Sequence, residues 1–347
     1  MRIDGLFIVD KPEGLTSLDV VREVKRRCRA KKAGHVGTLD PFASGVLPVA
    51  VNDGTRIVPF LDEEPKEYEG TLVLGEETDT DDPTGEVTHR SPIDGIGAED
   101  LAEVFETFRG KILQIPPMFS AVKVGGEPLY RLARKGIEVE RRAREVTVFD
   151  LRIEGIELPW VRFRLSCSRG TYVRTLVRDM GRRLGCGAYL LRLRRVRSGP
   201  YGLDQAIPFD ELRTQAPVSQ LRPWLISMEE ALPTMAAWIG EARLLERVRV
   251  GRTLTWKDLA LSDLPFLSKG RRVKMISPSD GLAAILEAEV DGDDLKEAHP
   301  NTVVFRPLRV FQKRRGFQET EAENVKEEND GIGTGEEERD YRAIQDP

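Results

Sequence analysis

The chain is poor in the residues that build disulfides, metal sites and membrane spans. It has three cysteines, an odd number without a CxxC spacing, and three widely separated histidines. This pattern indicates reduced thiols in a cytoplasmic protein and gives no support for a zinc site. No apolar run approaches the roughly 20 residues of a membrane-spanning helix, and the N-terminus lacks a signal-peptide core. We therefore expect a cytoplasmic protein without metal, disulfide or membrane segment.

The composition is that of a folded protein, and its charge is unevenly distributed. Of 347 residues, 40% are hydrophobic and 32% are charged, and at about 150 residues per domain two domains are expected. The formal net charge is −5, but residues 316–347 hold eleven acidic and three basic residues, a net −8. Residues 1–315 therefore carry +3. The acidic tail, 313–347, is polar enough to favour disorder, and the folded part is basic.

One basic stretch stands out from the rest. Residues 162–197 contain eleven arginines and one acid. Arg174, Arg178 and Arg182 recur every four residues, so a helix would place them in one stripe opposite its apolar side. The guanidinium group suits phosphate, whereas an ordinary solvated face carries charges of both signs. The stretch therefore favours a polyanion partner, although it names no reaction.

The apolar periodicity predicts an α+β fold. Strands and helices mix without a regular βαβ alternation. The expected strands lie near residues 5–10, 68–74, 146–156, 160–167 and 191–193. One helix is expected to begin after Thr16, with Asp19 as its capping-box partner. Two further helices are expected at 98–109 and 173–184. Residues 33–48 show neither period and are predicted to be a loop. Residues 77–82 are expected to form an acidic turn.

Two further segments are distinct from this pattern. Residues 115–145 contain Pro116, Pro117 and a glycine pair, and we expect an excursion from the main sheet. Beyond a linker around 217–233, short apolar runs at 273–276, 282–290 and 303–311 are separated by Gly and Asp turns. They predict a small β-rich domain of about 80 residues.

The residues of the predicted loop at 33–48 do not identify an enzyme by themselves. Asp40-Pro41 is a common turn opener, because an Asp side chain accepts backbone N–H bonds. A lone His35 is more often structural than catalytic, and the ordinary role of Tyr68 or Tyr172 is packing in a strand or core.

A series of motifs in fixed order resembles one family. Residues 34–48 (GHVGTLDPFASGVLP) resemble the signature loop of the TruB family of bacterial tRNA pseudouridine-55 synthases. The resemblance spans residues 5–210. Its other motifs are residues 5–14 (GLFIVDKPEG), 66–68 (KEY), 77–80 (ETDT), 115–130 (IPPMFSAVKVGGEPLY), 168–175 (SRGTYVRT) and 193–195 (LRR).

The resemblance implies a pseudouridine-synthase fold and a domain order. It implies a mixed, mainly antiparallel sheet with flanking helices in a catalytic domain at 1–230, with an RNA-gripping insertion at about 115–145. Residues 233–312 resemble a PUA domain, a small RNA-binding β-barrel, chiefly in the ending 303–311 (VVFRPLRVF). The tail, 313–347, lies outside the family pattern.

The resemblance also assigns the site. Asp40 matches the catalytic aspartate, Tyr68 the tyrosine that stacks on the target base, and Arg174 the arginine that pairs with the aspartate. A carboxylate can be a nucleophile or a base on the sugar, and an Arg partner favours its charged form. The remaining substrate-binding residues are Tyr172, His35, Lys11 and Leu193, and the expected RNA-backbone residues are Arg178, Arg182, Arg194 and Arg195.

The implied activity is isomerisation of uridine 55 in the T-loop of tRNA. Cleavage of a C–N bond and formation of a C–C bond exchange no electrons, so no cofactor is expected. The target lies inside the tRNA elbow and must be flipped out. The implied partner is the T arm and elbow of tRNA, bound by a monomer. Two alternatives remain: a pseudouridine synthase for another structured RNA, and an RNA-binding or tRNA-folding module with secondary catalysis.

Overall fold

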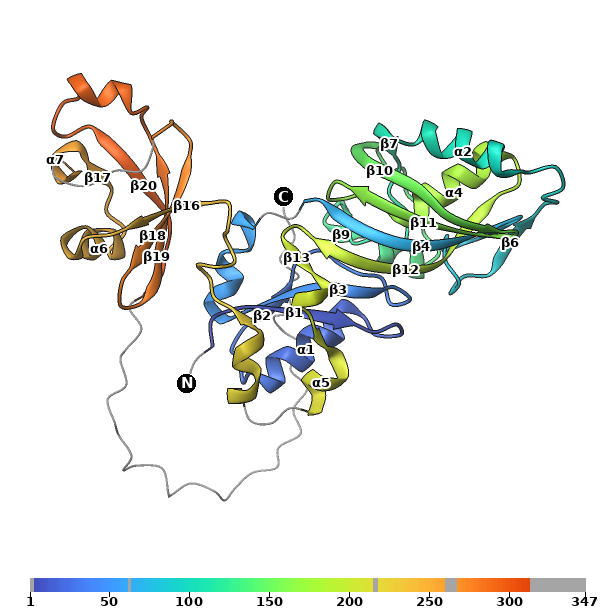
Figure 1. Ribbon diagram of the computed structural model, residues 1–347, viewed down its shortest axis with the longest axis horizontal. Helices are drawn as coiled ribbons and strands as arrows, with labels where there is room; N and C mark the ends of the chain where they lie inside the picture. Colours follow the sequence, from blue (N-terminus) through green and yellow to red (C-terminus); the bar gives the residue numbers. More distant parts are fainter. Residues whose placement is uncertain (1–2, 62–63, 215–217, 260–266, 313–347) are drawn as a thin grey trace, which may run out of the picture. The chain divides into compact units, whose positions relative to one another are not determined.

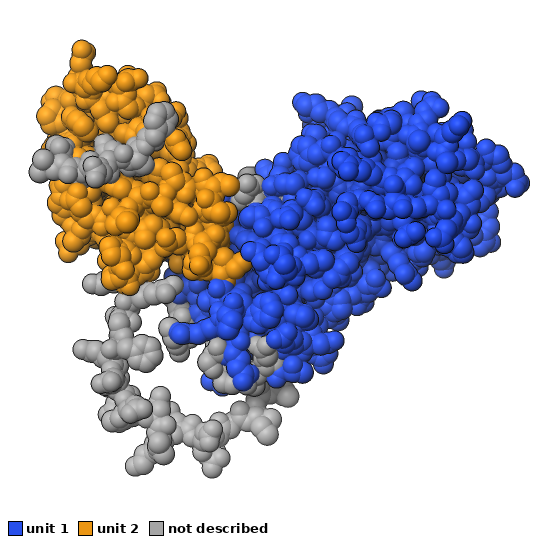
Figure 2. All heavy atoms as spheres, viewed as in Figure 1, with its two compact units in different colours: residues 1–225 blue, residues 226–347 orange. Residues whose placement is uncertain are grey.

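The chain divides into two compact units. The computed structural model describes residues 3–61, 64–214, 218–259 and 267–312. Unit 1 comprises residues 1–225 and unit 2 residues 226–347 (Figure 2). The predicted tail, 313–347, lies outside the described residues. Within those residues, no helix combines the length and apolar character that crossing a membrane requires.

Unit 1 is built around one large sheet (Figure 1). Its main path runs β14-β1-β3-β12-β4-β11-β10-β7, with only the β1–β14 and β3–β12 pairs parallel among these neighbours. This confirms the predicted mixed, mainly antiparallel sheet. The strands are β1 (Gly5–Lys11), β3 (Ser44–Val51), β4 (Lys66–Leu74), β7 (Gly110–Gln114), β10 (Arg144–Glu157), β11 (Trp160–Cys167), β12 (Ala188–Ser198) and β14 (Ile207–Pro208).

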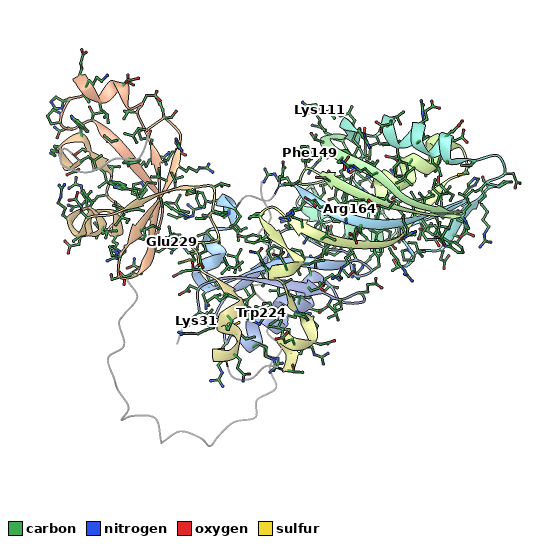
Figure 3. All side chains as sticks on the ribbon, in the orientation of Figure 1. Lys31, Lys111, Phe149, Arg164, Trp224 and Glu229 are labelled. Carbon is green, nitrogen blue, oxygen red and sulfur yellow. The ribbon has the colours of Figure 1, made fainter. Side chains whose placement is uncertain are left out.

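Four helices of unit 1 flank the sheet. They are α1 (Ser17–Arg27), α2 (Ala98–Thr107), α4 (Val173–Leu184) and α5 (Phe209–Thr214). The predicted capping box closes the start of α1, because Thr16 and Asp19 bond each other's backbone N–H groups. The apolar sides of α1 and α4 join the inward side chains of β11 in one core, while Arg162 and Arg164 are exposed on the other side of β11 (Arg164 is labelled in Figure 3).

The prediction of a loop over residues 33–48 is wrong in part. Strand β2 (Ala33–His35) pairs antiparallel with β3, and only residues 36–43 form a loop. Strand β3 has no polar alternation because it is buried on both faces, and its Gly45 and Pro48 masked the strand character. The predicted acidic turn likewise begins in a strand, β5 (Glu76–Thr78), which pairs with β6 (Val87–Arg90).

The predicted excursion lies outside the main sheet except at its end, where Arg144 and Glu145 already belong to β10 and pair with β7. It contains a two-stranded hairpin, β8 (Lys123–Val124) with β9 (Glu127–Pro128), followed by α3 (Leu129–Arg134). The shorter elements of the chain are β13 (Tyr201–Gly202), β15 (Leu225–Ile226), η1 (Asn52–Arg56), η2 (Val58–Phe60), η3 (Leu203–Gln205), η4 (Val218–Trp224) and η5 (Asp293–Glu297).

Unit 2 has its own five-stranded sheet and core. The strand order is β16-β18-β19-β20-β17, and Trp238 stacks on Phe305 with ring centres 5.3 Å apart. Among the described residues no pairing joins β16 to β17, so the sheet is open and a closed barrel is not seen. The elements are β16 (Ala236–Ile239), α6 (Ala242–Arg249), β17 (Leu254–Thr255), α7 (Trp256–Leu259), β18 (Arg272–Ser277), β19 (Gly281–Ala288) and β20 (Val303–Val310).

Candidate active site

The loop between β2 and β3 holds Asp40 and is fixed at several points. Ser17, the first residue of α1, hydrogen-bonds Leu39 twice: its Oγ donates to the carbonyl at 2.8 Å and accepts from the N–H at 2.9 Å. The Gly14 N–H donates to the Pro41 carbonyl at 2.8 Å. The Asp40 carbonyl accepts from the Ala43 N–H at 3.1 Å. These bonds on both sides of Asp40 give its carboxylate a defined position.

Arg174 connects Asp40 to three other segments. Its Nε donates to Asp40 Oδ2 at 2.7 Å, and its two terminal nitrogens donate to the carbonyls of Thr80 and Phe119 at 2.8 and 2.9 Å. A second carboxylate, Asp82, lies 3.5 Å away. The Arg174 side chain is 4% exposed and that of Asp40 is 33% exposed. The guanidinium is therefore buried and fixed, and it presents a partly open carboxylate.

Only one oxygen of Asp40 is engaged in this way. Within the described ranges, Oδ1 of Asp40 accepts no hydrogen bond, whereas Oδ2 is held by Arg174. A carboxylate oriented through one oxygen and open at the other can attack an electrophile or accept a proton.

Tyr68 and Arg195 face each other on neighbouring strands. Residue 68 of β4 is in register with residue 195 of β12, and both side chains are buried. Burial raises the pKa of Tyr68 to about 12, and the Arg195 charge opposes that shift. Tyr68 is therefore a neutral phenol near neutral pH.

Lys11, at the end of β1, is a buried lysine beside the same loop. Its Nζ donates to the carbonyls of Pro12, Leu15 and Pro41 at 2.8, 2.7 and 3.3 Å. Burial lowers the pKa of Lys11 to about 8, while the charge of Asp40 acts in the opposite direction. Lys11 thus holds the loop through the Pro41 carbonyl and the preceding turn through the carbonyls of Pro12 and Leu15.

His35 and Tyr172 are two further predicted site residues, and they come from different elements. His35 ends β2, and burial, followed by the charge of Arg195, lowers its pKa to about 4. Its Nδ1 is buried without a hydrogen-bond partner in the described part of the chain. Tyr172 precedes α4, and its backbone exchanges two hydrogen bonds with the Gln114 side chain. Burial raises the pKa of the Tyr172 hydroxyl.

Leu193 is a buried residue of β12, in register with Gly70 of β4. Its segment also borders a hollow of about 450 Å³ whose lining includes Arg162, Arg164 and Arg192 and does not include Asp40. Leu193 itself lines this hollow, together with Ser44 and Arg194.

The arginine stripe differs from what the sequence predicts. Arg174 is buried rather than exposed, Arg178 pairs with Asp81 and Asp179, and Arg182 pairs with Glu77. Asp179 belongs to the helix itself, Glu77 to β5 and Asp81 to the turn that follows β5. Local counting of charges missed them because most lie about 100 residues away in sequence.

The other two residues predicted to contact the RNA backbone, Arg194 and Arg195, also bind groups within the protein. Arg194 pairs with Asp10 at 2.7 Å. Arg195 is 1% exposed and donates to the carbonyls of Val46, Thr38 and Gly37 at 2.7, 3.4 and 3.0 Å. Its expected contact with RNA backbone is corrected accordingly: the buried guanidinium holds both ends of the Asp40 loop.

Sequence reasoning missed Asp82 and Gln114 as parts of the site. Asp82 lies in the predicted acidic turn. The sequence signal that could have indicated its role is the combination of this cluster of acids with the arginines that recur every four residues from Arg174. Gln114 ends β7, where a 2% exposed polar side chain satisfies the backbone of Tyr172. Nothing in its sequence context signals that contact. In the described part of the chain no three His, Cys, Asp or Glu side chains form a cluster suited to a metal ion.

Comparison with known proteins shows which family the chain belongs to. Residues 25–173 match the model of the TruB family pseudouridylate synthase N-terminal domain, and residues 174–233 match that of the tRNA pseudouridylate synthase B C-terminal domain. A relative from Geobacter sulfurreducens, named tRNA pseudouridine synthase B, is 48% identical over 312 residues, which are 89% of this chain and 100% of the relative. The chain belongs to the TruB family of pseudouridylate synthases.

Other relatives agree with this membership. A tRNA pseudouridine synthase B from Haemophilus influenzae is 42% identical over 74% of this chain and 83% of its own length. Among solved structures, a chain in a Cbf5–Nop10–Gar1 complex is 29% identical with a TM-score of 0.65, covering 89% of this chain and 85% of that one. The α+β pseudouridine-synthase fold expected from the sequence is thereby confirmed.

Proposed function

We propose that this TruB-family chain isomerises uridine to pseudouridine at position 55 in the T-loop of tRNA. Its relatives over most of its length are tRNA pseudouridine synthases B. The observation that carries the mechanism is the Asp40–Arg174 pair, in which a buried guanidinium holds one carboxylate oxygen and leaves the other open.

The reaction requires what this pair provides. The bond between N1 of uracil and C1′ of the ribose breaks, the base rotates, C5 bonds to C1′, and the C5 proton leaves. We assign Asp40 as the catalytic group, acting as a nucleophile or as a base on the sugar. Arg174 positions it and keeps a positive charge beside the reacting carboxylate. No redox step is involved, and the scheme uses no cofactor.

The surrounding residues are assigned to substrate binding. Tyr68 offers an aromatic face for the uracil, and its neutral phenol can stack without carrying charge into the site. His35, neutral for the same electrostatic reason, can stack where bases have left the T-loop, which offsets part of the few kcal/mol of unstacking. Tyr172, Lys11 and Leu193 complete the proposed set.

Unit 2 and the wider assembly are also proposals. We assign 1–230 as the catalytic domain, 115–145 as its RNA-gripping insertion and 233–312 as a PUA-like RNA-binding domain, supported by the five-stranded sheet and its final strand β20. The partner is the T arm and elbow of tRNA. The three cysteines are unpaired and buried, in keeping with a protein of the cytoplasm. We assign a monomer from the family pattern.

The test compares wild type with Asp40→Asn on unmodified tRNA. Asn keeps the size and one hydrogen-bond acceptor but cannot act as a nucleophile or base. Wild type is expected to form pseudouridine at position 55, detected by chemical mapping, and the variant to form none above background. A tRNA with cytidine at position 55 is the substrate control.

Each departure from that result has a definite meaning. No pseudouridine in the T-loop with wild type rejects the proposed activity, and product at another site or in another RNA selects the alternative substrate. Product formation by Asp40→Asn would remove Asp40 as the catalytic residue.

A further inference from the structure

A short basic segment between α1 and β2 has an unusual backbone. Arg29 has a φ of +47°, a left-handed conformation that favours glycine, and it directly follows the helix C-cap residue Cys28. The N–H groups of Arg29 and Ala30 bond back to the carbonyls of Arg26 and Lys25. The chain therefore keeps a long cationic side chain where glycine would be less strained, and such positions cluster at functional sites.

The residues that follow are held by a second strained position. Asn52, which has a φ of +50° and is buried, accepts at its Oδ1 from the N–H groups of Lys31 and Lys32 at 2.8 and 3.4 Å. Its Nδ2 donates to the Ile3 carbonyl at 2.6 Å, and its own N–H donates to the Lys32 carbonyl at 2.8 Å. The backbone under the two lysines is fixed, so their side chains start from defined points at the surface (Lys31 is labelled in Figure 3).

We call Arg29, Lys31 and Lys32 the basic ridge. All three are exposed, and among the described residues their side chains have no ion-pair or hydrogen-bond partner. The nearest acid in sequence, Glu23, already accepts from Arg26 and Arg27.

The ridge contrasts with the stretch at 162–197. There, most arginines are matched by carboxylates: Arg162, Arg164, Arg174, Arg178, Arg182, Arg194 and Arg197 all have ion pairs. An arginine already paired must exchange partners before it binds a phosphate, whereas an unpaired cation releases only water and counterions. The unpaired positive charge of unit 1 thus includes the ridge.

The ridge lies within reach of an RNA at the Asp40 site. Helix α1 begins at Ser17, which bonds the loop at Leu39, and it ends at Arg27, two residues before Arg29. With a rise of 1.5 Å per residue, the helix separates the loop from the ridge by roughly 15 Å. That distance corresponds to a few nucleotides of a strand, since one strand of duplex DNA carries a phosphate per about 3.4 Å of helix axis.

We propose that the basic ridge binds the phosphodiester backbone of the substrate RNA as a second contact area beside the Asp40 site. Three unpaired cations on a fixed backbone suit phosphates and offer no group that would read a base, so the contact is independent of sequence. The proposal rests on the proposed function only in taking RNA as the substrate.

The main experiment neutralises the ridge. Arg29→Gln, Lys31→Gln and Lys32→Gln are combined, and the affinity for labelled tRNA is measured by anisotropy over a range of salt concentrations, in an Asp40→Asn background to prevent turnover. The slope of log affinity against log salt should fall by about one per lost phosphate contact, and affinity at low salt should drop about tenfold or more. In the otherwise wild-type chain, single-turnover rate at saturating tRNA should be unchanged.

A matched control carries three neutralised cations that have partners. Arg90→Gln, Lys111→Gln and Arg152→Gln remove the same charge from exposed residues paired with Glu76, Glu145 and Asp150. This control should keep the wild-type salt slope. A ridge variant whose slope and affinity match the control overturns the proposal. Because the readout is binding, absence of pseudouridine formation would reject the proposed function separately.

Two further arms sharpen the test. The isolated T-arm stem-loop is compared with full-length tRNA: a loss with both RNAs assigns the phosphates to the T arm, and a loss with full-length tRNA alone assigns them outside it. Arg29→Gly relieves the backbone and removes the charge, so it should unfold at a higher denaturant concentration and yet bind RNA several-fold more weakly. Unchanged RNA affinity in Arg29→Gly would remove Arg29 from the contact.

Discussion

Arg174 and Asp40 lie 134 residues apart in the sequence and meet at 2.7 Å through Nε and Oδ2. The same guanidinium lies 3.5 Å from Asp82, which in turn accepts hydrogen bonds from Thr80 and Thr84. One buried cation therefore serves two carboxylates, one of them partly open and the other 7% exposed. Substitutions of Arg174 can therefore test separately whether the site needs its positive charge or the geometry of its guanidinium group.

We expect Arg174→Lys to retain the fold and lose most of the activity. A lysine supplies the charge but cannot donate at once to Asp40, Thr80 and Phe119, and an error of about 1 Å in a reacting group can cost roughly 100-fold in rate. Single-turnover kinetics should show a rate lowered by about that factor with tRNA affinity nearly unchanged.

The companion variant Arg174→Met tests the charge itself. It leaves Asp82 buried without its cation and should lower the free energy of unfolding by about 3–5 kcal/mol, measured in urea. A rate for Arg174→Lys equal to that of wild type would show that charge alone is sufficient and that the fixed geometry is not needed.

A second prediction concerns Arg195 and its neighbour two residues on. Arg195→Met removes the donors of three carbonyls in a buried place, each unsatisfied group costing about 1–3 kcal/mol, so we expect a loss of at least 3 kcal/mol. Arg197→Met is the matched control on the same strand: its side chain is 45% exposed and pairs with Glu67 at 3.4 Å. Its loss should stay below about 1 kcal/mol. Equal losses in urea unfolding would refute the structural role given to Arg195.

The elements with a clear period could be predicted from sequence. Strand β11 alternates cleanly, α4 repeats apolar residues at helical spacing, and the capping box marks the start of α1, so all three were located closely. Strand β3 could not be, because both of its faces are buried and the alternation that signals a strand is therefore absent.

The candidate site is indicated by the resemblance and not by its charges. Asp40 carries no signal in its own residue type, and only the ordered motifs indicated it. The pairing of Arg178 with Asp81 joins segments 97 residues apart, so counting charges along the chain overestimated the positive surface. The ridge at Arg29 shows the converse: its importance depends on a backbone angle and on missing partners, which only three dimensions provide.

The pH dependence of stability should reveal His35. Its pKa falls from 6.5 to about 4 on folding, so between these values the unfolded chain binds more protons and stability rises with pH. The contribution is complete above pH 6.5 and disappears as pH falls through 4, a difference of about 3 kcal/mol. Urea unfolding of wild type and His35→Gln over pH 4–7 should show a shallower dependence in the variant. Parallel curves for the two proteins would contradict the shift.

Two glycines with positive φ distinguish backbone strain from steric contact. Gly14 has a φ of +84° with open space where a Cβ would lie, so Gly14→Ala should cost only the strain, about 1–2 kcal/mol. Gly45 has a φ of +107°, and a Cβ there would overlap the carbonyl oxygen of Arg195 on the paired strand β12. Because backbone atoms of a sheet cannot retreat, Gly45→Ala should cost at least 3 kcal/mol and also lower activity by displacing the end of the Asp40 loop. Urea unfolding and single-turnover kinetics of both variants test this, and similar costs at the two positions would mean that strain alone, rather than the close approach of β3 to β12, explains the glycine at position 45.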